Sequence, residues 1–250
     1  MTTLYPRTAW LSRLLAFGLL ALFVTTGHAE PLEGYRYRQQ TEDKIEYFDW
    51  LLEKPGDFHL SAVSDSETHR TVLDDHLNTE SWTLDNPEQQ TSVKARREAD
   101  RIILTGRWHG ELIDKQLRID DAPWYQAMSL SLRAFLASPQ DSLEFWTLRP
   151  DKLQPLKLRV TRRGLETVRI EGQSVEAQRL EVRLTGLGSL LGHSLYWFRP
   201  SDGLFLQYQG PNGMPGLATT TITLEKELFA ATATQSNLAC THTIHTPPAP

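Results

Sequence analysis

Cysteine is almost absent from this chain: Cys240 is the only one among 250 residues. A single cysteine cannot form an intramolecular disulfide, so the fold must be held together by a large hydrophobic core. Cys240 lies in a tail rich in Thr, Ala and Ser, which predicts a thiol without a structural role; an intermolecular disulfide is the alternative. No cysteine lies at the end of the N-terminal apolar run, which argues against a diacylglyceryl anchor there.

Recognisable catalytic and cofactor motifs are absent as well. The sequence has no Gly-x-Ser-x-Gly nucleophile elbow, no glycine-rich phosphate loop and no dinucleotide-binding fingerprint. Its net charge is −5, and acidic and basic residues are mixed along the chain. A nucleic-acid-binding protein needs a concentrated basic face, so that class of partner is disfavoured. We therefore expect no cofactor, no bound metal and no nucleic-acid partner.

A long apolar run occurs only at the N-terminus. Arg7 and Arg13 come before the apolar core of residues 14–24, and the small residues Gly27 and Ala29 fit the −3 and −1 positions of a cleavage site. The run is short for a membrane span, which needs about 20 residues. We predict a cleavable signal peptide and export to the periplasm, with an uncleaved N-terminal anchor as the alternative.

Cleavage near Ala29 defines the expected domain organisation. Removal of residues 1–29 changes the net charge from −5 to −7 and leaves no further candidate for a membrane span. The mature chain has the length of one large domain or two small ones. We predict a single β-rich domain over residues 30–229. The segment 230–250 lacks periodicity and ends in Thr-Pro-Pro-Ala-Pro, so we predict a disordered tail.

Alternation of apolar and polar residues dominates between Tyr35 and Glu225. In residues 168–171 and 179–184, for example, every second side chain is apolar. This pattern is typical of strands in an antiparallel sheet with one buried and one hydrated face. Short polar turns separate the segments at hairpin spacing, and together they predict about a dozen strands of five to ten residues.

One segment breaks the alternation. The sequence Asp-Asp-Ala-Pro at 120–123 is typical of a helix start, and Pro139 ends the pattern. The large apolar residues between them recur at spacings of four, four and three: Trp124, Met128, Leu132 and Phe135. These spacings predict an amphipathic helix of about fifteen residues. We expect a mainly β fold, with one large curved antiparallel sheet and this single helix against its concave face.

The C-terminal half carries a further pattern. Residues 169–172 (Arg-Ile-Glu-Gly) lead through a polar turn into the strand-like run 175–180, and residues 196–206 read as a strand, a turn and a strand. On these features, the stretch 156–224 resembles the C-terminal half of uncharacterised bacterial periplasmic proteins of a domain-of-unknown-function family related to the LolA-like lipoprotein carriers. The resemblance implies a β-clam (half-barrel) architecture, in which a curved sheet wraps a helix and leaves an apolar cavity. It implies no catalytic residues.

Aromatic and apolar side chains are the first candidates for a site. A pocket for a hydrophobic ligand is lined by such residues, but the same residues also fill the cores of β proteins. In the run Tyr196-Trp197-Phe198, strand geometry places Trp197 on the face opposite its two neighbours. Either both faces are covered there, or one presents aromatic rings to a ligand. The candidate ligand-binding residues are Trp124, Met128, Leu132, Phe135, Trp146, Trp197 and Phe205.

Two polar clusters are further candidates. His69, Asp74, Asp75 and His76 are close in sequence and could bind a divalent metal or provide a catalytic base, but we interpret them as a solvated turn. The basic residues between 157 and 183 alternate with acidic ones, which indicates a cross-strand charge ladder; a platform for phosphate or lipid headgroups is the alternative.

Three functions follow from these patterns. The leading hypothesis is a non-enzymatic periplasmic module that binds an apolar ligand, a lipid or an acyl-bearing partner, in a cavity of about a few hundred cubic ångströms between sheet and helix. The first alternative is an envelope assembly protein whose core is filled, with Trp124, Met128 and Leu132 fully packed, and which binds a protein partner. The second is a hydrolase with His69 or His76 beside a carboxylate in a cleft.

Overall fold

A computed structural model describes residues 31–186, 192–211 and 218–230. They form one antiparallel sheet of 14 strands and one helix, in agreement with the predicted fold class. The predicted signal peptide and most of the predicted tail, with Cys240, lie outside the described residues. Within the described residues, no helix has the length and hydropathy needed to cross a bilayer.

The chain runs through the sheet in two meanders separated by the helix. The first meander contains β1 (Pro31–Thr41), β2 (Lys44–Glu53), β3 (Phe58–Ser64), β4 (Thr68–Leu73), β5 (Thr79–Asn86), β6 (Thr91–Glu98), β7 (Arg101–Trp108) and β8 (Glu111–Arg118). Helix α1 (Met128–Ala137) follows. The second meander contains β9 (Ser142–Arg149), β10 (Gln154–Ile170), β11 (Gln173–Leu184), β12 (Ser194–Phe198), β13 (Phe205–Pro211) and β14 (Thr219–Ala230).

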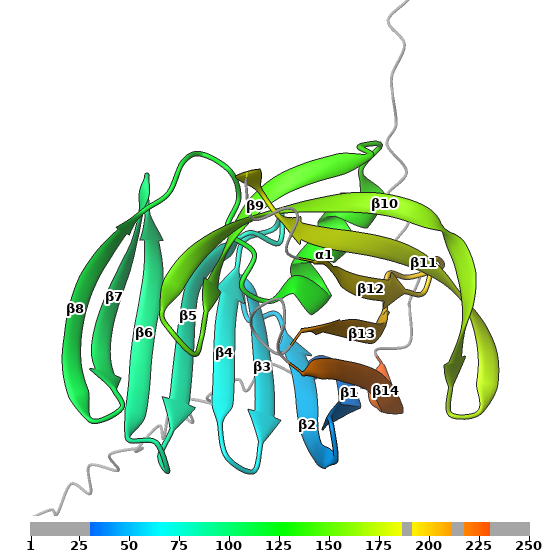
Figure 1. Ribbon diagram of the computed structural model, residues 1–250, viewed down its shortest axis with the longest axis horizontal. Helices are drawn as coiled ribbons and strands as arrows, with labels where there is room; N and C mark the ends of the chain where they lie inside the picture. The colour runs from blue at the N-terminus through cyan, green and yellow to red at the C-terminus, as the bar shows by residue number, and fades with distance from the viewer. Residues whose placement is uncertain (1–30, 187–191, 212–217, 231–250) are drawn as a thin grey trace, which may run out of the picture.

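Pairing of the first strand with the last joins the two meanders. Each strand pairs with the next one in the chain, except that β8 and β9 are the two edges and β1 pairs with β14. The sheet is therefore open and continuous. It curls so that β9, β10 and β11 arch over α1, which lies on the concave side (Figure 1).

Several turns between strands have the geometry that their sequences predict. His109 and Gly110 connect β7 to β8 with positive φ angles of 51° and 83°, and Glu171 and Gly172 connect β10 to β11 with 50° and 77°. Two central residues with positive φ define the tight hairpin turn whose twist matches that of the strands. His109 is therefore a hairpin residue. Strand lengths are more varied than predicted, because β10 alone has 17 residues.

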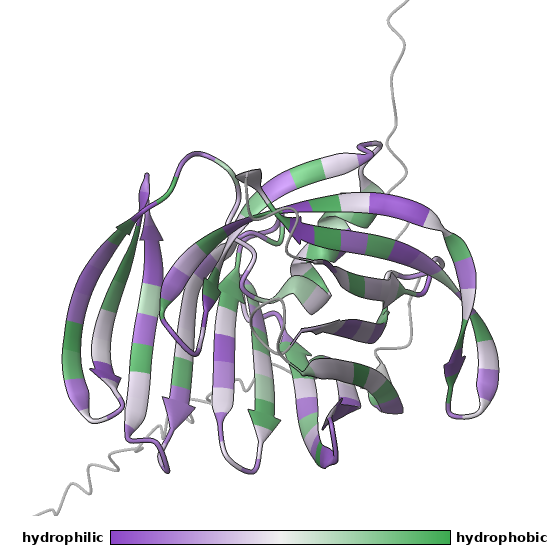
Figure 2. Cartoon of the chain, viewed as in Figure 1, coloured by the Kyte–Doolittle hydropathy of each residue, from purple (hydrophilic) through white to green (hydrophobic). Residues whose placement is uncertain are grey.

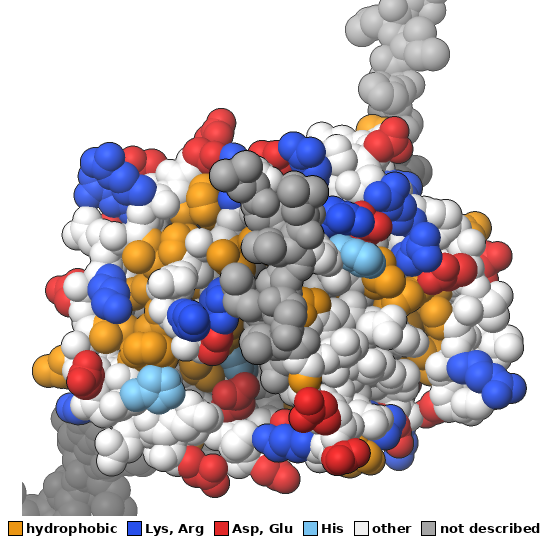
Figure 3. All heavy atoms as spheres, in the orientation of Figure 1, with side chains coloured by type: hydrophobic (Ala, Val, Ile, Leu, Met, Phe, Trp, Pro, Cys, Tyr) orange, Lys and Arg blue, Asp and Glu red, His pale blue; other side chains and the backbone are white. Residues whose placement is uncertain are grey.

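Alternating hydropathy along the strands builds two hydrophobic clusters (Figure 2). The larger surrounds α1 and takes residues from the middle of the sheet and from the second meander. The smaller lies on β5 to β7 and includes Trp82, Ile102, Trp124 and Leu148. On the face shown in Figure 3, hydrophobic side chains gather over β5 to β8, between scattered Lys and Arg residues.

The predicted start of the helix is wrong. Residues 120–127 are not helical, and α1 has 10 residues rather than about fifteen. The reason is competition for backbone hydrogen bonds. Trp146 N–H donates to the carbonyl of Pro123 (2.7 Å), Tyr125 N–H donates to the carbonyl of Trp146 (2.8 Å), and Thr79 N–H donates to the carbonyl of Trp124 (2.8 Å). These bonds hold the segment in an extended crossing between β5 and β9, so the helix begins only after it.

Polar contacts fix α1 against the sheet at both ends. Arg133 forms a bidentate ion pair with Glu33 of β1, with two N–O distances of 2.9 Å. The indole of Trp50 donates to the hydroxyl of Ser129 (3.0 Å) in the first turn. At the other end, Arg162 donates to the carbonyls of Phe135, Leu136 and Ser138, at 3.2, 3.3 and 2.9 Å. Its charge thus lies at the negative end of the helix dipole.

Replacement of the capping arginine tests this anchoring. We expect Arg162→Met to lower the free energy of unfolding by about 2 kcal/mol, because three carbonyls lose a charged donor. Urea unfolding at pH 7 measures the change. The matched control is Arg70→Met on β4, which removes an exposed guanidinium 3.4 Å from Asp85 and should change stability by less than about 0.5 kcal/mol. Equal effects of the two substitutions would contradict the capping role.

Candidate apolar binding pocket

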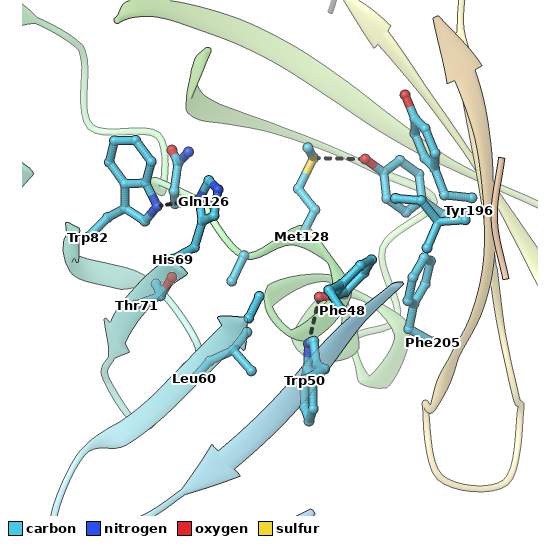
Figure 4. A pocket seen from close by; sticks show the side chains of 15 residues that line it. Phe48, Trp50, Leu60, His69, Thr71, Trp82, Gln126, Met128, Tyr196 and Phe205 are labelled. Atoms are coloured by element: carbon cyan, nitrogen blue, oxygen red, sulfur yellow. Dashed lines mark hydrogen bonds between the residues drawn. The ribbon is translucent and has the colours of Figure 1, made fainter. Parts of the chain in front are cut away.

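A pocket of about 230 Å³ opens between the N-terminus of α1 and the concave face of the sheet. Figure 4 shows aromatic and apolar side chains converging on it from both meanders. The lining residues are Phe48, Trp50, Leu60, Ala62, His69, Thr71, Trp82, Gln126, Ala127, Met128, Ser129, Tyr196, Phe205, Tyr208 and Ile222. Strand alternation explains the set, since Phe48 and Trp50 of β2 are two residues apart, as are Leu60 and Ala62 of β3.

The polar atoms of the aromatic walls already have partners within the protein. The Trp50 indole is bonded to Ser129, the Trp82 indole donates to Nδ1 of His69 (3.3 Å), and the hydroxyl of Tyr196 donates to the sulfur of Met128 (3.5 Å). Burial raises the pKa of the Tyr196 phenol well above its ordinary value, so this hydroxyl stays neutral. The pocket therefore offers an apolar, uncharged surface.

Two further pockets adjoin the first. One, of about 340 Å³, shares His69, Gln126, Met128, Tyr196 and Tyr208 with it and extends beneath β9, β10 and β11. The other, of about 190 Å³, shares Phe48, Ala62 and His69 with it and extends toward the turn between β3 and β4. We call them the arch pocket and the turn pocket, and the first one the central pocket. Together they form a hollow along the concave face.

His69 borders all three pockets and pairs with a carboxylate. Its Nε2 lies 2.9 Å from Glu67, while Nδ1 accepts from the Trp82 indole. Because an indole N–H can only donate, Nδ1 carries no proton and Nε2–H is the donor to Glu67. This hydrogen bond is the main reason why the pKa of Glu67 lies below its ordinary value. Both ring nitrogens are occupied, so neither is free to take a proton from a substrate.

The other members of that cluster form a turn. Asp74 accepts hydrogen bonds from the backbone of His76 and of Asn78, each at 2.8 Å, and from the Asn78 side chain at 2.9 Å. Asp75 is exposed and pairs with Lys54. The interpretation as a solvated turn is confirmed for Asp74, Asp75 and His76. In the described part of the chain, no three His, Cys, Asp or Glu side chains are grouped so as to hold a metal ion.

Gln126 organises the floor of the central pocket, and sequence reasoning missed it. Its side-chain oxygen accepts from the Trp124 indole (3.0 Å) and from the backbone N–H of Leu148 (2.9 Å), and its nitrogen donates to the carbonyl of Leu148 (3.0 Å). Its own backbone N–H donates to the hydroxyl of Thr79 (3.0 Å). A single glutamine in a segment that reads as helical gives no signal of this role.

Of the seven candidate ligand-binding residues, Met128 and Phe205 line the central pocket. Leu132 and Phe135 of α1 are fully buried in the larger hydrophobic cluster. Trp124 is fully buried in the smaller cluster, and Trp146 packs at its edge while its indole donates to Asp120 (2.7 Å). These last four residues border none of the three pockets.

Trp197, the seventh candidate, lies in the core as well. Tyr196, Trp197 and Phe198 are all buried, so both faces of β12 are covered, as one of the two sequence interpretations required. The Trp197 indole donates to Glu166, which also pairs with Arg179 at 3.0 Å. Only Tyr196 of the three borders the central pocket.

The basic residues of the second meander form the charge ladder predicted from their alternation with acidic residues. Glu181 of β11 lies between Arg163 and Arg183 and pairs with both, and Arg159 pairs with Glu144 at 2.6 Å. The hydrogen bond from Arg183 is the main reason why the pKa of Glu181 falls to about 2. With acidic partners interleaved, this face carries no concentrated positive charge.

Comparisons with known proteins support the fold. No protein-family model and no curated protein matches the chain. The structure is similar to that of a β-barrel-like protein of domain of unknown function DUF1849 from Brucella abortus, with a TM-score of 0.52 and 7% identity over 79% of this chain and 96% of that one. This likeness agrees with the predicted kind of fold, a curved β-sheet of a bacterial domain of unknown function.

Two solved structures are more distant. The hypothetical lipoprotein YmcC from Escherichia coli has a TM-score of 0.35 and 12% identity, over 78% of this chain and 84% of that one. A DUF1329 family protein from Desulfovibrio piger has a TM-score of 0.26 and 13% identity, over 79% and 85% of the two chains.

The pair of Glu67 and His69 predicts a pH dependence. Since the pKa of Glu67 is lowered in the folded protein, its contribution to stability is fully present above the unfolded value of 4.5 and is lost as the pH falls through the lowered value. Glu67→Gln should therefore lose less stability than the unmodified protein between about pH 5 and pH 3. Urea midpoints at several pH values measure the difference. The control is Glu176→Gln, an exposed change on β11, whose stability should vary with pH as that of the unmodified protein does. If the stability of Glu67→Gln falls just as steeply with pH, the stabilising role of the Glu67–His69 pair is wrong.

Proposed function

We propose that this protein is a non-enzymatic binding module for an apolar ligand, a lipid or an acyl-bearing partner, held between α1 and the concave face of the sheet. The observation that carries the proposal is the central pocket. It is open, it lies where the β-clam resemblance places a cavity, and its walls are mainly aromatic and aliphatic. With the adjoining arch pocket, it reaches the size range of ligand sites, about 300–1,000 Å³.

The chemistry of the walls favours an apolar ligand over a polar one. Indole and phenol groups that already hydrogen-bond to Ser129, His69 and Met128 have little to offer a polar ligand, which would lose its hydration without compensation. An apolar ligand gains about 25 cal/mol for each Å² removed from water. Met128 is also suited to this place, because its flexible thioether adapts to ligands of different shape.

The shape of the hollow favours an elongated ligand. The arch, central and turn pockets follow one another and share His69, so a chain-like molecule can contact more than one of them. A compact ligand would leave part of this apolar surface in water. An acyl chain fits both the shape and the chemistry.

The alternatives receive less support. A filled core requires Trp124, Met128 and Leu132 to be fully packed. Trp124 and Leu132 are fully buried, whereas Met128 is half-buried and borders open space. A hydrolase requires a histidine near a carboxylate, and His69 meets that requirement; its two nitrogens are nevertheless both engaged. Export to the periplasm through a signal peptide over residues 1–29 remains part of the proposal, and it would place the protein beside envelope lipids.

A charge at the centre of the hollow tests the proposal. We expect Met128→Arg to weaken binding of a neutral fluorescent probe, N-phenyl-1-naphthylamine, at least about tenfold, because an unpaired guanidinium replaces apolar wall. Fluorescence titration measures the affinity, and native mass spectrometry with lipid extraction identifies any ligand that copurifies. Leu112→Arg is the control, since Leu112 on the edge strand β8 is 79% exposed and far from the pocket residues in the sheet order.

The outcomes separate the candidate functions. Binding by the unmodified protein that is lost in Met128→Arg and kept in Leu112→Arg supports the proposal, provided that both variants unfold cooperatively. A ligand-free mass, together with no uptake of the probe, fatty acids or phospholipids, overturns it and favours the assembly protein with a protein partner.

A further inference from the structure

Arg149 is the only charged residue that is buried in the described part of the chain. Its side chain is 8% exposed, whereas every other arginine or lysine in an ion pair is at least 15% exposed. Arginine is almost never buried to this degree without a strong reason, because removal of its charge from water is costly. The position of Arg149 therefore calls for a partner or a function.

The side chain lies on the inner wall of the arch pocket. Phe145, Thr147 and Arg149 alternate along β9 and share one face, and Phe145 of this face is buried in the larger hydrophobic cluster. Thr147 and Arg149 both border the arch pocket, and Leu156 and Leu158 of the neighbouring strand β10, which pair with Thr147 and Phe145, lie beside them on the same wall. A guanidinium is thus placed within a mainly apolar hollow.

The known partner of Arg149 leaves one side of the guanidinium for another anion. Asp151 accepts from Nε (2.9 Å) and from Nη2, and among the described residues it is the only acceptor of Arg149. The two bonds use the edge of the guanidinium that Nε and Nη2 form, and they orient the guanidinium. A guanidinium has five N–H donors, so the donors on the Nη1 side remain for a second oxyanion.

Charge changes sign along the hollow. Glu46 and Glu67 border the turn pocket, and none of the described residues that line it is Lys or Arg. Among the described residues that line the arch pocket there is no Asp or Glu, whereas Arg149, Arg183 and two histidines border it. Arg183 alternates with the buried Val182 and pairs with Glu181, so its charge belongs to the outer face. Arg149 is therefore the inner cation of the arch end.

We propose that Arg149 binds the anionic headgroup of a single-chain amphiphile whose apolar tail lies in the central pocket. This inference rests on the proposed function and specifies its ligand class. The headgroup, a carboxylate or a phosphate, accepts hydrogen bonds from the Nη1 side of the guanidinium. The tail extends past Met128 and Tyr196, which border both pockets, toward the aromatic walls. The acidic lining of the turn pocket disfavours the reverse orientation.

Ten-carbon amphiphiles that differ only in the headgroup test the inference. Displacement of N-phenyl-1-naphthylamine at pH 7.5 gives the affinities of decanoate, decyl phosphate, decanol and decylamine. We expect the two anions to bind at least about tenfold more tightly than decanol, and decylamine most weakly. Acetate should not compete, because the site requires a tail as well as a charge.

Substitutions assign the preference to Arg149. Arg149→Met should reduce the ratio of decanoate to decanol affinity to about one while decanol binding changes little, and Arg149→Lys should retain part of the ratio. The matched control is Arg159→Met, an arginine of the outer charge ladder, which should leave the ratio unchanged. If Arg149→Met does not fold, Asp151→Asn decides, since loss of the competing carboxylate should increase the preference for anions.

Distinct results contradict the inference and the proposed function. Equal binding of all four compounds, or an anion preference that survives in Arg149→Met, overturns the inference alone. A preference for decylamine places the headgroup at Glu46 and Glu67 and overturns it as well. Failure of every compound, including decanol, to displace the probe or to bind overturns the proposed function together with the inference.

Discussion

The hydrogen bonds of Gln126 hold the segment that crosses from β8 to β9, and the rest of the architecture depends on that crossing. Both edges of the sheet adjoin this connection, so its path determines how the two meanders face each other. Gln126 bonds to Trp124 and to both backbone groups of Leu148 in β9, while its own N–H bonds to Thr79 at the start of β5. The side chain and the backbone N–H of Gln126 thereby connect the crossing segment to both meanders.

This crossing also explains why there is a pocket. Had residues 120–127 continued the helix, about two more turns at 3.6 residues per turn would have extended it over the concave face. Because these residues are extended, α1 has only 10 residues, about 15 Å at 1.5 Å per residue, and covers only part of the hollow. The space beyond its first turn is the central pocket, and Ala127, Met128 and Ser129 border it. The anchors at Glu33 and Arg162 keep the helix from sliding into that space.

The sequence predicted the fold more completely than the site, and the reason lies in the range of the interactions. Alternation along a strand and turn chemistry such as that of Glu171 and Gly172 are local, so they can be read from neighbouring residues. The four-residue spacing of Trp124 and Met128 is local too, but backbone bonds from Thr79 and Trp146 override it. The pocket wall joins Phe48, Trp82 and Phe205, which only the pairing of distant strands brings together.

Residues that break a local rule are informative here. Gln126 is a polar side chain in an apolar floor, and Arg149 is a charge on a buried strand face. Both polar atoms of the Gln126 side chain have partners within the protein, and these bonds give it a structural role. Arg149 is bonded on one side only among the described residues, and a buried cation with remaining donors is costly for stability alone. A leucine or methionine would fill the same wall without a buried charge, so we attribute the arginine at this position to the anion that we propose it binds. Residues that conflict with their local surroundings are expected at functional sites. The bonds of Gln126 are made within the protein, whereas Arg149 keeps donors for a ligand, and this difference separates a structural residue from a candidate binding residue.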